Sequence, residues 1–172
     1  MSTKKIKTGN RTAICAGSFD PPTLGHFNII ERGLKIFDKL IVAVAINTSK
    51  NSLLSVKERV QLLTNLLKTK KNVEVVSFDG LLVDYACKRG VSALLRGIRN
   101  MSDYEYESQM AMVNKVLHPK LETVFMMTEG KYSHLSSTFI REILTFGGSC
   151  KGMIDPMVEE KLKRCFQTAS KK

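Results

Sequence analysis

The sequence contains no tryptophan, and its apolar runs are far shorter than the roughly 20 residues that cross a bilayer as a helix. Its basic start, MSTKKIKTGNR, is not followed by the apolar segment and small-residue cleavage site of a secretory signal. The short apolar runs and the missing secretory signal argue against a membrane-spanning or secreted protein. We expect a cytoplasmic protein with no membrane partner.

The four cysteines, Cys15, Cys87, Cys150 and Cys165, lack the spacing that metal sites and disulfide frameworks need. None belongs to a Cys-x-x-Cys pair, and no pair of histidines lies near them in the sequence. Zinc sites draw on such pairs, and disulfide frameworks belong to small secreted domains. We therefore expect free, mostly buried thiols in a reducing compartment.

Positive charge is in excess, with 27 lysines and arginines against 16 acidic residues and a formal net charge of +11. Such an excess is typical of proteins that bind nucleic acids, so a basic nucleic-acid-binding module is the alternative from a different functional class. Much of the excess lies at the chain ends, however, with four of the cations among residues 1–11. We interpret residues 1–11 as a flexible basic arm ahead of one domain, residues 12–172, and expect no nucleic-acid partner.

Short apolar runs alternate with amphipathic segments along the rest of the chain. Runs such as LIVAVAI are apolar throughout, which is typical of parallel strands covered on both faces. Strands that alternate with helices are joined by right-handed crossovers. The sequence therefore predicts a single doubly wound, Rossmann-like α/β domain with a five-stranded parallel sheet and helices on both faces. The predicted strands are residues 12–16, 40–46, 73–78, 92–95 and 123–127, and the predicted helices are residues 26–37, 56–68, 81–89, 103–117, 137–146 and 156–168.

The first predicted strand and helix are joined by AGSFDPPTLGH, residues 16–26, which is rich in conformationally special residues. In doubly wound sheets this first junction is the usual place for a phosphate. Gly17 and Gly25 permit close approach of a ligand to the backbone. Two prolines stiffen the loop between them, and His26 adds a donor in the first helical turn. Neither G-x-x-x-x-G-K-[ST] nor G-x-G-x-x-G is present, so this stretch by itself leaves a rigid, well-packed turn as the alternative.

A second cluster, LLRGIRN, closes the fourth predicted strand with Arg96, Gly97 and Arg99. Arginines at the carboxyl end of a strand suit bidentate binding of a phosphate beside the first junction. The alternative is ion pairing with the acidic residues of the DYEYE stretch that follows, which we expect for one arginine rather than for both.

A third cluster, KYSHLSSTFIR, residues 131–141, follows the fifth predicted strand. Ser136, Ser137 and Thr138 lie at a predicted helix start, where hydroxyls and free N–H groups can bind a phosphate chain, although at least one hydroxyl must cap the helix instead. Lys50, in the loop after the second strand, is a further candidate. Because the first, fourth and fifth strands end at one edge of the sheet, we expect the clusters to form one cleft.

Together these stretches resemble a known family. GSFDPPTLGH, INTSK, LLRGIRN with DYEYE behind it, and SSTFIR occur in the order and spacing of bacterial phosphopantetheine adenylyltransferases. That family belongs to the nucleotidyltransferase superfamily marked by an (H/T)-x-G-H motif, and TLGH alone would indicate only the superfamily. The resemblance covers residues 12 to about 168.

The resemblance implies an enzyme that transfers the adenylyl group of ATP to 4′-phosphopantetheine, giving dephospho-coenzyme A and pyrophosphate in the penultimate step of coenzyme A biosynthesis. The substrate phosphate attacks in line, so no protein nucleophile is needed. Mg²⁺ is the expected cofactor, carried by the ATP phosphates because no paired carboxylates are placed to hold it. The resemblance also implies a homohexamer, with coenzyme A as a candidate inhibitor.

The same resemblance implies roles for individual residues. His26 is the catalytic residue, which binds the α-phosphate and stabilises the pentacovalent transition state. Ser18 holds the attacking phosphate, Lys50 and Arg96 bind it, and Leu82 lines the pantetheine site. The residues implied around ATP are Ser18, Phe19, His26, Gly97, Ile98, Arg99 and Glu107, with Tyr132, Ser133, His134, Leu135, Ser136, Ser137 and Thr138.

Two positions depart from the usual family residues, since a tryptophan is common at the place of Tyr132 and a lysine at that of Arg141. Other branches of the superfamily have arginine there, so Arg141 does not decide the branch. The alternative functions within the superfamily are a nicotinate-mononucleotide adenylyltransferase and a cytidylyltransferase, which share the motif around His26. The RGIR–DYEYE block and Lys50 favour the pantetheine branch.

Overall fold

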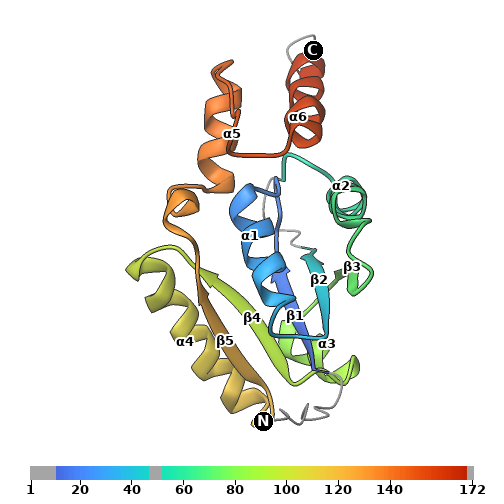
Figure 1. The fold of residues 1–172 in the computed structure, drawn as a ribbon, viewed down its shortest axis with the longest axis vertical. Coiled ribbons are helices and arrows are strands. Elements are labelled where there is room, and N and C mark those ends of the chain that lie inside the picture. The colour runs from blue at the N-terminus through green and yellow to red at the C-terminus, as the bar shows by residue number, and fades with distance from the viewer. Residues whose placement is uncertain (1–10, 47–51, 170–172) are drawn as a thin grey trace, which may run out of the picture.

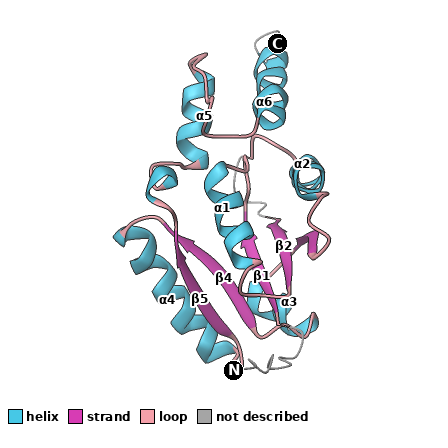
Figure 2. Cartoon of the chain, viewed as in Figure 1, coloured by secondary structure: helices cyan, strands magenta, loops and turns pink. Residues whose placement is uncertain are grey.

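A parallel sheet of five strands, magenta in Figure 2, forms the centre of the structure, a computed structural model that describes residues 11–46 and 52–169. The strands are β1 (Thr12–Gly17), β2 (Lys39–Ala45), β3 (Val73–Phe78), β4 (Ala93–Ile98) and β5 (Glu122–Met127). Their order is β3-β2-β1-β4-β5, and every neighbouring pair is parallel. The order therefore reverses between β1 and β4, which is where doubly wound folds bind ligands.

Six α-helices accompany the strands in the described part of the chain (Figure 1). They are α1 (Leu24–Gly33), α2 (Val56–Leu67), α3 (Leu82–Lys88), α4 (Met101–Leu117), α5 (Ser137–Thr145) and α6 (Pro156–Ala169). Each overlaps one predicted helix. A 3₁₀ turn, η1 (Gly130–Tyr132), lies outside the predicted helices.

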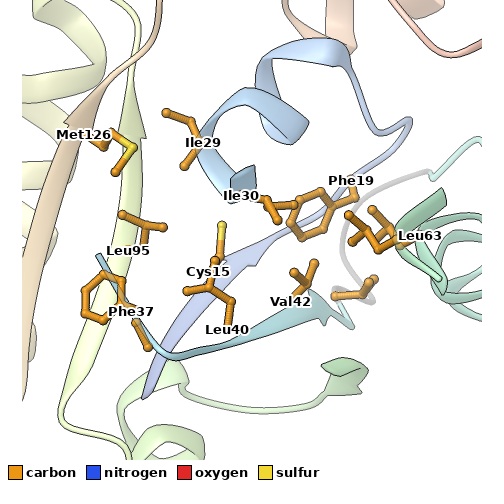
Figure 3. Close-up of a cluster of buried hydrophobic side chains, with 13 residues drawn as sticks. Cys15, Phe19, Ile29, Ile30, Phe37, Leu40, Val42, Leu63, Leu95 and Met126 are labelled. Atoms are coloured by element: carbon orange, nitrogen blue, oxygen red, sulfur yellow. The ribbon is translucent and has the colours of Figure 1, made fainter. Parts of the chain in front are cut away.

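The strands are apolar on both faces because helices cover both faces of the sheet. On one face α1 and α2 pack against Val42 and Leu95 in the cluster that Figure 3 shows. On the other face Val83 of α3 packs with Ile14 and Leu94. This arrangement confirms the predicted doubly wound α/β fold.

In the view of Figure 1, α5 and α6 lie above the carboxyl ends of the strands. A third buried cluster, which includes Leu54, Leu62 and Ile140, joins them to α2. The hydroxyl of Ser137 donates to the carbonyl of Pro21 at 2.8 Å and thus fastens the start of α5 to the loop after β1.

The end of β4 differs from the prediction in a way that bears on function. The strand continues to Ile98 because Arg96 and Gly97 keep their pairing with Phe125 and Met126 of β5. Arg96 therefore projects from the strand itself, where its backbone is held by the sheet.

The range of α1 also differs from the predicted residues 26–37, since the helix begins earlier and ends at Gly33. Gly33 lies so close to the sheet that a β-carbon there would be 2.4 Å from Leu95 Cδ2. A β-carbon on Gly97 would likewise be 2.8 Å from Ile29 Cγ1. These two glycines let α1 lie directly against β4, so the helix start reaches the carboxyl edge of the sheet.

Candidate active site at the switch point of the sheet

A cavity of about 340 Å³ opens at the carboxyl ends of β1 and β4, where the strand order reverses. A volume of this size falls within the range of small-molecule sites. The predicted site residues that line it are Ser18, Phe19, His26, Arg96, Gly97, Arg99, Glu107, Leu135, Ser136, Ser137 and Thr138. The three sequence clusters therefore contribute to one cavity.

Other predicted site residues are not brought into this cavity. Ile98, Tyr132, Ser133 and His134 are not among the residues that line it. The side chain of Ile98 is buried in the fold, whereas the other three lie at η1 and the turn after it and remain partly or fully exposed. Lys50 falls outside the described residues. For these positions the sequence-based roles stay predictions.

His26 lies in the first turn of α1, and its ring closes a reciprocal cap with Thr23. Its Nδ1 accepts the backbone N–H of Thr23 at 2.9 Å and lies 3.0 Å from the Thr23 hydroxyl. Because Nδ1 accepts, the neutral ring carries its proton on Nε2. The helix start thus selects one tautomer and leaves Nε2–H as the donor of the ring.

The surroundings of His26 keep its imidazole neutral. Burial lowers the pKa of His26 to about 4, and the positive charges of Arg99 and Arg96 act in the same direction. The ring of Phe19 packs beside it, with ring centroids 5.0 Å apart. At neutral pH His26 can therefore donate a hydrogen bond without carrying a charge.

Arg96 and Arg99 each form a two-point ion pair with α4. Arg96 donates Nε–H to Glu107 Oε2 at 2.8 Å, a second N–H to Oε1 of the same carboxylate, and Nη1–H to the carbonyl of Ala16. Arg99 binds Asp103 in the same manner, with distances of 2.7 Å for Nε–Oδ2 and 2.9 Å for Nη2–Oδ1. Asp103 and Glu107 lie one helical turn apart, so α4 presents both carboxylates on one side. The prediction that only one of the arginines pairs with the DYEYE acids is therefore wrong.

The start of α5 adds hydroxyl groups to the cavity wall. Ser136 accepts the N–H of Phe139 at 3.2 Å and so provides the expected helix cap, while Ser137 is engaged with Pro21. Thr138 is exposed. The N–H groups of this first helical turn are the natural partners of an anion.

Leu82 lines a second hollow, an apolar groove of about 180 Å³ that also includes Val83 and Met110. Arg96 and Glu107 line both this groove and the cavity. Their ion pair therefore lies where a polar cavity and an apolar groove meet, which suits a substrate with a phosphate head and a longer, less polar arm.

The lining also contains residues that are absent from those expected from the sequence, among them Thr23 and Asp103. Both carry a readable signal. Thr23 precedes His26 by the three positions of a capping box, and Asp103 follows Arg99 by the four positions of a helical ion pair.

Within residues 11–46 and 52–169, no three histidine, cysteine or acidic side chains come together as a possible metal site. Over the same residues, no helix combines the length and the apolar character needed to cross a membrane.

The chain is similar to known proteins over most of its length. A family model described as cytidylyltransferase-like matches residues 14–143. The phosphopantetheine adenylyltransferase of Caldanaerobacter subterraneus subsp. tengcongensis is 52% identical over 157 residues, which cover 91% of this chain and 98% of that protein. The chain belongs to the phosphopantetheine adenylyltransferase family. A member from Clostridium botulinum is 48% identical over 144 residues, which cover 84% of this chain and 91% of that protein. Membership of this nucleotidyltransferase family confirms the resemblance identified from the sequence motifs.

A crystal structure from Vibrio parahaemolyticus, provisionally assigned as a nicotinate-nucleotide adenylyltransferase, shares the fold. It matches with a TM-score of 0.63 at 22% identity and covers 88% of this chain and 97% of that one. At this identity the likeness concerns the fold alone. The choice between acceptor substrates therefore depends on the adenylyltransferase relatives and on the site.

Proposed function

We propose that the protein transfers the adenylyl group of ATP to 4′-phosphopantetheine, giving dephospho-coenzyme A and pyrophosphate, the penultimate step of coenzyme A biosynthesis. The observation that carries the proposal is the cavity at the switch point, where a neutral histidine and two arginines supply donors, in a chain that belongs to this family.

In the proposed reaction an oxygen of the acceptor phosphate attacks the α-phosphorus of ATP in line. The new phosphorus–oxygen bond forms as the bond to pyrophosphate breaks, and no protein nucleophile takes part. The site must supply orientation and stabilise charge on the α-phosphate oxygens. His26 suits this role because its Nε2–H can donate to the α-phosphate while Nδ1 stays engaged with Thr23.

The arginines can bind phosphate without breaking their ion pairs. A guanidinium has five N–H groups. Two of those of Arg96 go to Glu107 and one to Ala16, and Arg99 uses two for Asp103 and one, at 2.8 Å, for the carbonyl of Leu135. Counting the hydrogen bonds with described residues, each guanidinium therefore has two N–H groups that can still bind a ligand. We assign Arg96 to the acceptor phosphate and Arg99 to ATP.

The groove beside Arg96 suits the acceptor. Its apolar lining, with Leu82 and Met110, can bind the pantetheine arm while the phosphate reaches Arg96 and the hydroxyl of Ser18. Lys50 is proposed to bind the same phosphate. ATP would then occupy the cavity between Phe19 and the start of α5, with its phosphates toward the helix N–H groups.

Mg²⁺ is the proposed cofactor, and it would be held by the ATP phosphates. The carboxylates that line the cavity, Asp103 and Glu107, are both engaged by arginines, so neither offers the free oxygens that Mg²⁺ prefers. When bound with ATP the ion neutralises part of the phosphate charge.

We further propose that the enzyme acts in the cytoplasm as a homohexamer. The 17-residue helix α4 has no buried residue in the single chain, and it exposes apolar side chains that include Tyr106, Met112 and Val116. An exposed apolar face of this kind suits contact with a second copy.

Coenzyme A carries the same pantetheine and adenylate parts as the product, so we propose it as an inhibitor that competes for the same cavity.

Pyrophosphate release from Mg²⁺–ATP tests the proposal, with 4′-phosphopantetheine and nicotinate mononucleotide compared as acceptors. We expect release with phosphopantetheine alone. His26→Ala should lower kcat by about 10²- to 10³-fold, the usual effect of removing one donor to transition-state charge, with little change in ATP affinity.

Release with the mononucleotide alone would keep the mechanism but replace the acceptor. Release with neither acceptor would overturn the proposed function. A large loss of ATP binding in His26→Ala, with turnover kept, would contradict the role of His26.

A further inference from the structure

Arg59 of α2 is a buried cation that lies outside the cavity lining. It is 3% exposed, and its Nη1 donates to the carbonyl of Ser18 at 2.7 Å and reaches the carbonyl of Ala45 at 3.5 Å. Its Nε is buried and has no hydrogen-bond partner. Burial lowers the pKa of this guanidinium, and the nearby charge of Asp20 opposes that effect. Arg59 therefore connects α2 to the carboxyl ends of β1 and β2.

The backbone that Arg59 holds is in an unfavourable conformation. Phe19, the residue after the bound carbonyl, has φ of 48°, which is rare for a bulky side chain and persists only where the surroundings enforce it. Directly after Phe19 in the chain, the Asp20 carboxylate accepts the N–H groups of Leu53 and Leu54 at 2.8 and 2.9 Å. Residues 18–20 are thus fixed from both sides.

This conformation places two cavity residues. Ser18 lines the cavity, and the Phe19 ring packs against the His26 ring on one side. Figure 3 shows Phe19 beside Ile30 and facing Leu63 of α2. A shift of the peptide between Ser18 and Phe19 would move the ring away from His26 and admit water to the imidazole.

Burying an arginine with an unpaired N–H lowers the free energy of unfolding, because the charge and the donor lose their contact with water. Apolar replacements of buried ionic groups are often neutral or stabilising. Stability alone therefore does not account for Arg59. We propose that Arg59 is a positioning residue for the adenylyl transfer: through the Ser18 carbonyl it holds Ser18 against the acceptor phosphate and Phe19 against His26. The inference rests on the proposed function for its kinetic consequence, but its effect on His26 is independent of substrate.

Two variants, Arg59→Met and Arg59→Gln, remove the bond to Ser18 with an apolar and a polar replacement. Leu67→Ala is the matched control, because Leu67 is buried on the same helix but lies at its far end. For each protein we would measure kcat per folded enzyme at a temperature well below its unfolding transition. We would also follow the His26 imidazole by ¹H–¹⁵N NMR against pH; the protein has three histidines, and the His26 signal is the one lost in His26→Ala.

We expect kcat to fall by roughly tenfold to a hundredfold in both Arg59 variants, the scale of a misplacement of about 1 Å. The pKa of His26 should rise toward its ordinary value in these variants, while Leu67→Ala keeps both readings close to wild type. A His26 pKa unchanged in whichever Arg59 variant folds would overturn the inference, and so would a kcat within twofold of wild type. If the wild type itself releases no pyrophosphate, the proposed function fails while the NMR reading still decides the role of Arg59.

Discussion

His26 links the chemistry of the site to the pH dependence of folding. Its pKa of about 4 in the folded protein lies below the ordinary value of 6.5. Between these two values the unfolded chain binds a proton that the folded protein does not bind. The free energy of unfolding therefore falls as the pH is lowered from about 6.5 to about 4, and below that range His26 adds no further change.

We predict that the free energy of unfolding contains a His26 contribution that drops by about 2 kcal/mol between pH 7.5 and pH 5. Urea unfolding at the two pH values measures it. In His26→Gln this part of the pH dependence should vanish, whereas the exposed His134→Gln should keep it. Equal pH dependence in wild type and His26→Gln would show that the folded pKa is close to ordinary.

Arg96 has a structural role and a proposed binding role, because it forms an ion pair with Glu107 and is proposed to bind the acceptor phosphate. We predict that Arg96→Ala raises the KM for phosphopantetheine about tenfold or more, with a smaller effect on the KM for ATP. Steady-state kinetics with each substrate varied in turn measures this.

Arg89→Ala is the matched control for Arg96→Ala. Arg89 also pairs with a carboxylate, Glu74 at 2.8 Å, but it follows α3 and contributes to neither the cavity nor the groove. Its removal should leave both KM values near wild type. An unchanged acceptor KM in Arg96→Ala would remove Arg96 from the acceptor site.

At the residue scale, the sequence predicts which side chains can bind a ligand better than it predicts which residues those side chains contact in the fold. The spacing of Arg96, Gly97 and Arg99 suffices to predict an anion site at a strand end. The pairing of Arg96 with Glu107 depends on how α4 turns back along β4, which short motifs do not specify. Helical spacing places Arg59 on the same face of α2 as Leu62 and Leu63, but nothing in VKERVQLL indicates that its guanidinium reaches the loop after β1.

At the scale of elements, the packing of α1 on β4 positions the catalytic histidine. Alternating apolar runs are enough to predict the strands and helices, because burial on both faces of a parallel sheet imposes that pattern. They do not predict the precise ends of α1 or β4. Those ends depend on close approaches at Gly33 and Gly97, which only the three-dimensional contacts reveal.

We predict that Gly33→Ala and Gly97→Ala each lower the free energy of unfolding by about 1–3 kcal/mol, because each added β-carbon overlaps a neighbouring side chain. Only Gly97→Ala should also lower kcat, since it presses on Ile29, one turn from His26, whereas Gly33 lies at the far end of α1. Thermal unfolding and pyrophosphate release measure the two effects. An unchanged kcat in Gly97→Ala, despite a loss of stability, would mean that the packing of α1 on β4 does not control the position of His26.

At the scale of the whole molecule, the described helices differ in how much of their apolar surface is buried. The sheet, α1, α2 and α3 share buried clusters, whereas α4 contacts β4 and β5 without burying any of its own residues. One wall of the proposed acceptor groove is formed by this helix. A partner copy on α4 would therefore stabilise the groove as well as cover the apolar face.

Val116→Glu tests this arrangement. Val116 is 81% exposed, so in an isolated chain the substitution should leave the free energy of unfolding within about 0.5 kcal/mol of wild type. In an assembly that covers α4, the added carboxylate would be buried without a partner, and the assembly should dissociate.

Light scattering after size exclusion measures the mass. The control is Phe146→Glu, an 84% exposed apolar position that directly follows α5. Figure 1 shows the helix α5 at the opposite end of the molecule from most of α4. We expect a smaller particle and a higher acceptor KM for Val116→Glu, and no change of mass for Phe146→Glu. An unchanged mass for Val116→Glu would mean that α4 is exposed in the working enzyme, and the groove would then have to bind its substrate without support from a second copy.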